Sequence, residues 1–138
     1  MSLHYLHNWK QYLIEDDYDY LIQYIENVKN NISNNEMIIL SGPARTGKST
    51  LMDDIKKYLG DEYCGYFETS GQMIYYENIK KLGIFCEIGP YTPSKRDSRA
   101  IINLIKYKQS LITATTDINR INNDLLDFCR IIDMEHIF

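Results

Sequence analysis

Apolar residues in the N-terminal part of the chain recur at helical spacing. Leu6, Trp9 and Leu13 lie three and four residues apart, and a second stripe repeats these steps: Tyr18, Leu21, Ile25, Val28 and Ile32. Steps of three and four residues place side chains on one face of a helix. The pattern predicts one or two helices over residues 3–33. The acidic cluster at 15–17 would begin the second helix, where carboxylates are favoured by the helix dipole.

From residue 37 onward, short apolar runs alternate with helical patterns, and turn residues such as Gly60 separate them. The predicted strands are 37–40, 63–68, 82–88, 110–116 and 129–134, and the predicted helices are 50–59, 73–80, 96–107 and most of 118–128. Strands that alternate with helices form a parallel sheet covered on both faces. The expected fold class is therefore α/β, with three layers, a five-stranded and mostly parallel sheet, and an N-terminal helical segment.

Length and composition fit one such domain. The chain has 138 residues, of which 44% are hydrophobic and 25% are charged, and these are ordinary globular values. No internal repeat, low-complexity tract or linker divides the chain. We expect a single domain over residues 1–138, with the N-terminal helical segment at 1–34 and the core at 36–134.

Other features of the sequence indicate the cellular compartment in which the protein is expected. No apolar run approaches the roughly 18 residues that a membrane span needs, and the N-terminus has no signal-peptide pattern. Cys64, Cys86 and Cys129 are widely spaced without a CxxC pair, which favours reduced thiols over disulfides or zinc ligands. We expect a soluble, intracellular, cytoplasmic protein with no membrane partner.

One segment between the first predicted strand and the next helix carries a specific motif. Residues 42–49, GPARTGKS, match the pattern G-x-x-x-x-G-K-[ST]. Glycines let backbone N–H groups wrap closely around phosphates, and the following helix directs its positive end at them. The motif predicts a P-loop NTPase that binds a nucleoside triphosphate, with ATP and Mg²⁺ as its ligands.

The motif also assigns roles to its residues. Lys48 is expected to reach the β- and γ-phosphates, and the Ser49 hydroxyl to ligate Mg²⁺. The other residues expected to surround the nucleotide are Gly42, Pro43, Ala44, Arg45, Thr46, Gly47 and Thr50.

Phosphoryl transfer also needs an acid that holds Mg²⁺ and orients water. Glu87 ends the third predicted strand, at the sheet edge where ligands bind, and is the expected catalytic acid and second metal ligand. Cys86 occupies the position where a first acid is usual, which leaves open a protein that binds nucleotide without hydrolysis. Glu68 ends the second strand in the same way and is the runner-up.

The end of the fourth predicted strand supplies further candidates. Thr116 and Asp117 would lie beside the γ-phosphate and hold the attacking water, although Asp117 is also suited to cap the next helix. Arg120 and Arg130 are candidate arginine fingers, with surface salt bridges as the alternative.

The order of these parts resembles the ATPase core of viral superfamily 3 helicases and related replication proteins, which belong to the AAA+ class. The resemblance spans roughly residues 36–134 and includes GPARTGKS, GIFCEI and ITATTD. It implies ATP hydrolysis, ring-shaped homo-oligomers, translocation along nucleic acid and a viral protein acting in a host cell. It places Asp117 where the family has an asparagine. Because the family's lysine-bearing hairpin is missing, a minimal ATPase of this lineage is expected rather than a complete helicase.

The net charge and its distribution bear on whether the protein is expected to bind nucleic acid. A net charge of −4 argues against a protein that coats nucleic acid with its whole surface. Basic residues gather at 95–108, where Asp97 is the only negatively charged residue. The segment is expected to be either a solvated helix face or a contact surface for single-stranded nucleic acid. Its basic residues are Lys95, Arg96, Arg99, Lys106 and Lys108.

A small P-loop kinase acting on a nucleoside or similar metabolite is the alternative function. Glu68 would then activate the acceptor hydroxyl, and Arg96 and Arg99 would cover the phosphates. Strand order separates the two functions: strand 110–116 between the glycine-loop strand and the Glu87 strand favours the ATPase, and direct adjacency favours the kinase. The stripe at 18–32 is expected either to pack on the chain's own sheet or to join subunits of a homo-oligomer.

Overall fold

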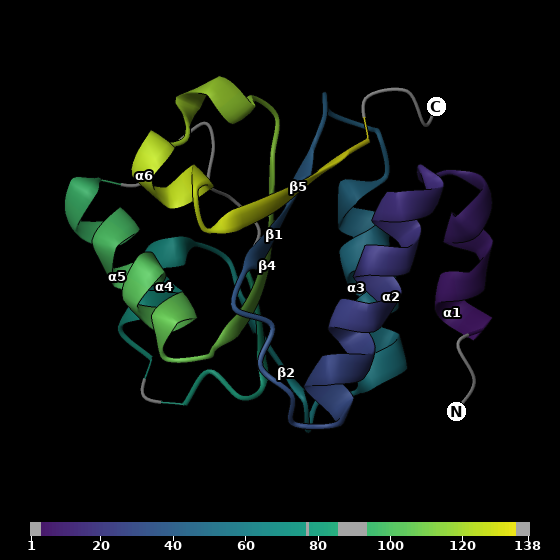
Figure 1. Ribbon diagram of the computed structural model, residues 1–138, viewed down its shortest axis with the longest axis horizontal. Coiled ribbons are helices and arrows are strands. Elements are labelled where there is room, and N and C mark those ends of the chain that lie inside the picture. The colour runs from purple at the N-terminus through teal and green to yellow at the C-terminus, as the bar shows by residue number, and fades with distance from the viewer. Residues whose placement is uncertain (1–3, 77, 86–93, 135–138) are drawn as a thin grey trace.

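The computed structural model describes residues 4–76, 78–85 and 94–134, which form a three-layer α/β domain (Figure 1). The described residues contain five strands in one sheet, and all strand pairs are parallel. The strands are β1 (Met37–Ser41), β2 (Cys64–Phe67), β3 (Leu82–Phe85), β4 (Ser110–Thr115) and β5 (Cys129–Asp133). The predicted fold class is confirmed, and the sheet is wholly rather than mostly parallel.

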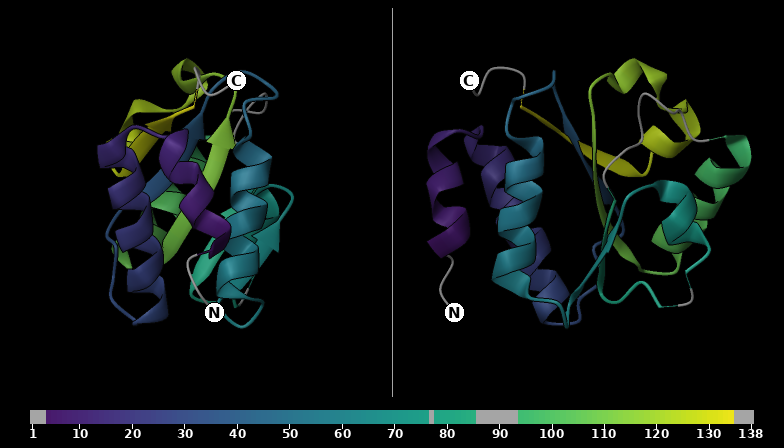
Figure 2. Two further views of the ribbon diagram at one scale, coloured as in Figure 1. Left: turned by 90° about the vertical axis from the view of Figure 1, so that its right-hand side faces the viewer. Right: turned by 180° about the vertical axis from the view of Figure 1, so that it is seen from behind.

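Helices cover both faces of this sheet (Figures 1 and 2). On one face lie α1 (His4–His7), the 3-10 helix η1 (Asn8–Gln11), α2 (Glu15–Lys29) and α3 (Lys48–Leu59). On the other lie α4 (Ser70–Ile74), α5 (Lys95–Lys106), the 3-10 helix η2 (Ile118–Arg120) and α6 (Asn123–Leu126). None of the described helices is long and apolar enough to cross a membrane.

The strands divide the core by alternation. Ile38 and Leu40 of β1 point into the cluster beneath α2 and α3, whereas Met37 and Ile39 join the cluster beneath α5 and α6. Successive strand residues face opposite sides of a sheet, so a strand buried on both faces is apolar throughout. This explains why the run before the glycine loop has no polar position until Ser41.

The stripe of α2 packs within the chain. Leu21, Ile25 and Val28 are almost fully buried in the cluster on the α2 side of the sheet. Ile32 lies beyond the end of α2 and is 55% exposed. Of the two expectations for this stripe, the structure shows the intramolecular one.

Two predicted helices differ in the structure. The helix predicted at 73–80 instead spans Ser70–Ile74, because Thr69 caps it by accepting a hydrogen bond from the Gln72 amide at 3.2 Å. The helix predicted over 118–128 is divided into η2 and α6, since the side chains of Asp117 and Asn122 each cap a separate short element. Residues 86–88, predicted to end the third strand, lie outside the described residues.

Strand order places β1, which leads into the glycine loop, inside the sheet and next to the edge strand β5. The order is β2-β3-β4-β1-β5, so β4 lies between β1, which precedes the glycine loop, and β3, which precedes Glu87 in the sequence. This is the order that the sequence analysis assigned to an ATPase.

Candidate nucleotide-binding site

The glycine loop connects the carboxyl end of β1 to the first residue of α3. Gly47 is the residue before the helix and has a φ of 89°, in the left-handed region that glycine adopts without strain. Arg45, also in the loop, has a φ of 67°. The α3 helix begins at Lys48, two residues before its predicted start, so the motif lysine belongs to its first turn.

Two neighbouring strands hold the base of this loop. The Gly42 amide donates a hydrogen bond to the Thr115 carbonyl of β4 at 3.2 Å, and the Ser41 carbonyl accepts one from the Met134 amide at 2.7 Å. The end of β4 therefore lies beside the loop, as strand order required for Thr116 and Asp117. The second support, which comes from the end of β5, where Asp133 is in register with Ser41, was not predicted from the sequence. An acid at the end of the run CRIID was the available signal.

Lys48 turns back onto the loop. Its ammonium donates hydrogen bonds to the carbonyls of Gly42 at 2.5 Å and Pro43 at 2.6 Å, and it lies 3.3 Å from the Thr46 hydroxyl. The residue is only 9% exposed, and burial lowers the pKa of its amine. Within the described residues no carboxylate forms an ion pair with it. Moving a cation from water into the protein without a counter-ion costs free energy. This arrangement therefore fits an anionic ligand.

The first turn of α3 extends this anion site. Ser49 and Thr50 are exposed there, and the first N–H groups of a helix have no partner within the helix. These groups, the helix dipole and Lys48 form a donor set for a triphosphate. The Ser49 hydroxyl is an oxygen ligand of the kind that Mg²⁺ takes. The residues present thus fit a nucleotide with Mg²⁺. Glu87 and Cys86 follow β3 directly and lie outside the described residues.

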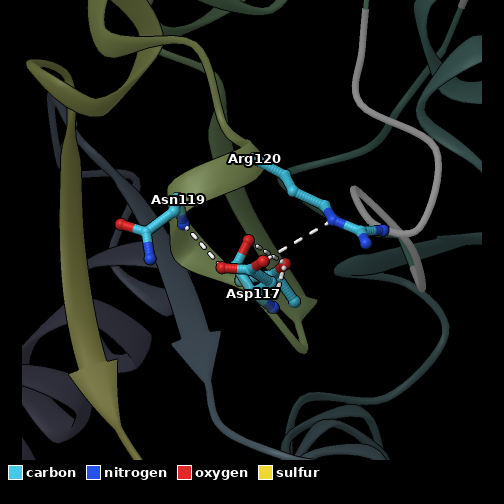
Figure 3. A network of polar contacts seen from close by, with 4 residues as sticks. Asp117, Asn119 and Arg120 are labelled. Atoms are coloured by element: carbon cyan, nitrogen blue, oxygen red, sulfur yellow. Dashed lines mark hydrogen bonds and ion pairs between the residues drawn. The ribbon is translucent and has the colours of Figure 1, made fainter.

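Asp117 is the centre of a small polar network beside the loop (Figure 3). Its carboxylate accepts a hydrogen bond from the Asn119 amide at 3.0 Å and forms an ion pair with Arg120 at 3.5 Å. The Asp117 amide donates to the Thr115 hydroxyl at 3.1 Å. The carboxylate therefore caps η2, as the alternative role for this residue required. Thr116 is exposed between Thr115 and this network.

Arg130 is held by contacts with α2. It forms an ion pair with Asp17 at 3.1 Å and lies 4.7 Å from the centre of the Tyr20 ring. These contacts tie β5 to α2 and occupy the guanidinium. Of the two candidate arginine fingers, Arg120 is the more exposed, with its side chain 53% accessible.

The other candidate residues lie away from the loop. Glu68 follows β2, which β3 and β4 separate from β1. The basic residues of 95–108 are exposed but divided between the two ends of α5: Lys95, Arg96 and Arg99 lie near its start, and Lys106 and Lys108 at and beyond its end.

The described cysteines are free thiols, of which Cys64 is buried and Cys129 is partly buried. Burial raises the pKa of both Cys64 and Cys129 to about 12, which keeps them protonated and unreactive at neutral pH. In the described part of the chain, no group of three or more His, Cys, Asp or Glu side chains is placed to hold a metal ion.

Comparison with known proteins shows the fold. No family model matches the chain, and no curated protein matches its sequence. Solved structures do match. The RuvB T158V structure of Thermotoga maritima has 16% identity and a TM-score of 0.58, over 91% of this chain and 46% of that one. A DNA replication initiation factor has 13% identity and a TM-score of 0.56, over 86% and 45%. PCH-2 of C. elegans has 13% identity and a TM-score of 0.55, over 95% and 46%. At these identities the likeness is one of fold alone, the three-layer α/β fold with a parallel sheet, and the chain spans less than half the length of each structure.

Proposed function

We propose that the protein binds ATP with Mg²⁺ in its glycine loop and hydrolyses the nucleotide. The observation that carries this proposal is Lys48, a buried ammonium surrounded by loop oxygens at the start of α3 without a carboxylate partner in the described residues. On binding, the lysine would exchange the carbonyls of its own loop for the β- and γ-phosphates. The α3 amides would hold the same phosphates from the helix end.

The remaining roles follow from the sheet edge. Ser49 and Glu87 would hold Mg²⁺, which neutralises phosphate charge when bound. Glu87 follows β3 and would orient the attacking water, and Thr116 and Asp117 at the end of β4 would lie beside the γ-phosphate. Asp117 would do so while it caps η2, because its network already lies next to Gly42 through Thr115.

We further propose that hydrolysis drives work on nucleic acid or on a partner protein. Two matched structures support this, since one is described as a Holliday junction branch migration motor and another as a DNA replication initiation factor. The resemblance of the motif order to viral superfamily 3 helicases points in the same direction. Lys95, Arg96 and Arg99 at the start of α5 are the contact surface that this proposal assigns.

The kinase alternative has less support. Direct adjacency of β1 and β3 would favour it, and β4 lies between them. A nucleotide-binding protein without hydrolysis is the third possibility, because Cys86 stands where a first acid is usual.

Replacement of Lys48 tests nucleotide binding. We expect Lys48→Ala to weaken Mg·ATP binding by about a hundredfold or more, since it removes the charged donor from the phosphates, with the fold retained. Isothermal titration calorimetry measures the affinity, and circular dichroism checks the fold. Lys57→Ala is the matched control, because Lys57 lies in the same helix, carries the same charge and is exposed. Unchanged affinity in Lys48→Ala would contradict the site.

A further inference from the structure

A hollow of about 580 Å³ opens along the outer edge of the sheet. It follows β2, which is an edge strand (Figure 2), and it is bounded by α3 on one side and by the segment after α4 on the other. Gly65 makes this shape possible. A Cβ on Gly65 would lie 2.5 Å from the Ile79 carbonyl oxygen, so only glycine lets the segment around Ile79 lie this close to β2.

Aromatic rings line the hollow. Tyr66 is 45% exposed and Tyr76 is 60% exposed, although both are large enough to contribute to a core. Phe67, which is buried, packs edge-on against Tyr76 with ring centres 5.2 Å apart and holds that ring in place. The Lys56 ammonium lies 4.8 Å from the centre of the Tyr66 ring. Each tyrosine is thus braced by a neighbour while part of it faces solvent.

Lysines extend the hollow towards the amino ends of the strands. Lys80 lines the first hollow and also a second one of about 230 Å³, which Lys81 and Lys108 complete. We call the two hollows together the edge groove, with the lining residues Tyr66, Tyr76, Lys56, Lys80, Lys81 and Lys108. Asp61 is the one carboxylate among its described lining residues, and none of the four lysines is in an ion pair within the described chain.

We propose that the edge groove binds a single-stranded nucleic acid, with bases stacked on Tyr66 and Tyr76 and phosphates on the lysines. A combination of aromatic rings and cations is the chemistry that single strands require, because every base has a face to stack and every linkage has a charge to neutralise. A duplex offers its phosphates but keeps its bases stacked within the helix. The groove therefore fits an unpaired strand better than a double-stranded one.

This surface is separate from the glycine loop and from the start of α5. The second hollow includes Ser110, the first residue of β4, whereas the loop leaves the carboxyl end of β1. Arg96 and Arg99 do not line either hollow in the described structure. The proposal does not depend on ATP hydrolysis, so binding is measured without nucleotide, and its failure would leave the proposed ATP site untouched.

Fluorescence anisotropy with labelled oligonucleotides of about 20 nucleotides tests the groove. Oligo-dT, oligo-U and a DNA duplex of equal length are titrated with protein that retains its circular dichroism spectrum. We expect Tyr76→Ala to weaken single-strand binding by about tenfold, because a stacked base is lost, and Tyr76→Phe to bind like the wild type. We expect Lys81→Gln to reduce the dependence of log K on log salt by roughly 0.7, as for one lost phosphate contact. Comparison of oligo-dT with oligo-U shows whether DNA or RNA is preferred.

The controls are matched in charge and exposure. The first control is Lys57→Gln, because Lys57 lies one residue from Lys56 but outside the groove. The second is Tyr107→Ala, which removes a tyrosine that is 85% exposed and lines neither hollow. Both are expected to bind like the wild type. The proposal is overturned if neither oligonucleotide binds, which would leave a protein as the occupant. It is also overturned if Tyr76→Ala binds normally while Arg96→Ala and Arg99→Ala do not, or if the duplex binds as tightly as the single strands.

Discussion

Lys48 is a buried amine, and its burial makes the stability of the protein depend on pH. Burial lowers the pKa of its amine from the ordinary value of 10.5. Below the lowered pKa the amine is charged in both the folded and the unfolded chain, and the cost of burying the charge is fully present. As the pH rises through the lowered pKa towards 10.5, the unfolded chain binds more protons than the folded one, so the free energy of unfolding increases.

This increase of the free energy of unfolding with pH gives a prediction for Lys48→Met, which keeps an unbranched side chain without the charge. Urea denaturation without nucleotide between about pH 8 and pH 10.5 should show the wild type gaining stability relative to Lys48→Met as the pH rises. The lysines and tyrosines common to both proteins cancel in this comparison. A difference that is constant with pH, or that changes with the opposite sign, would mean that Lys48 has its ordinary pKa and is solvated.

At the scale of elements, the α2 stripe separates a core residue from an exposed one. Leu21 is fully buried, whereas Ile32 is 55% exposed beyond the helix end. We expect Leu21→Ala to lower the free energy of unfolding by about 2–5 kcal/mol, because it leaves a cavity in the core. We expect Ile32→Ala to change it by less than about 0.5 kcal/mol. Urea denaturation of both variants measures the difference, and equal effects would contradict the packing of α2 on its own sheet.

This packing also limits how assembly can be tested. Leu21→Asp would not serve as a test of oligomerisation, since a carboxylate at a fully buried position is expected to unfold the domain and not merely to separate subunits. Homo-oligomerisation itself stays a prediction. Light scattering and the dependence of ATPase activity on protein concentration test it without any change to α2.

The elements show what a single sequence can and cannot predict. All five strands were predicted within about two residues where the structure describes their ends, because buried parallel strands are apolar runs that turn residues interrupt. The position of the glycine loop between β1 and α3 was predictable, since its motif is recognised by fixed spacing between a strand and a helix. The α4 helix and the divided 118–128 segment were not. Their limits depend on single caps, Thr69, Asp117 and Asn122, whose side chains favour several local conformations equally.

The candidate site was predictable in part for the same reason. Periodicity placed Thr116 and Asp117 at a strand end, and strand order brought that end to the loop. The support from β5 and the edge groove join residues through tertiary contact. No spacing in the sequence encodes such contacts.

At the scale of the molecule, strand order decides which acid we expect to act in hydrolysis. Glu87 follows β3, which only β4 separates from β1. Glu68 follows β2, the edge strand, which lies one strand farther from β1. We expect Glu87→Gln to lower ATP hydrolysis on the order of a hundredfold with ATP affinity retained, because the amide keeps the shape and loses the charge. Glu68→Gln should hydrolyse ATP normally. Phosphate release and calorimetry together measure the two effects, and the reverse pattern would favour the kinase alternative.

The interior position of β1 in the sheet also has a consequence for how the domain folds during synthesis. The partners of β1 are β4 and β5, so the strand that carries the glycine loop pairs only with segments about 70 to 90 residues later in the chain. Contacts of such long sequence separation form slowly, and on the ribosome they must wait for the later strands to emerge. The amide of Gly42 and the carbonyl of Ser41 find their partners only then. The loop is thus among the last parts of the sheet to gain its native supports, and a newly made chain holds the glycine loop in its native place only when the sheet is complete.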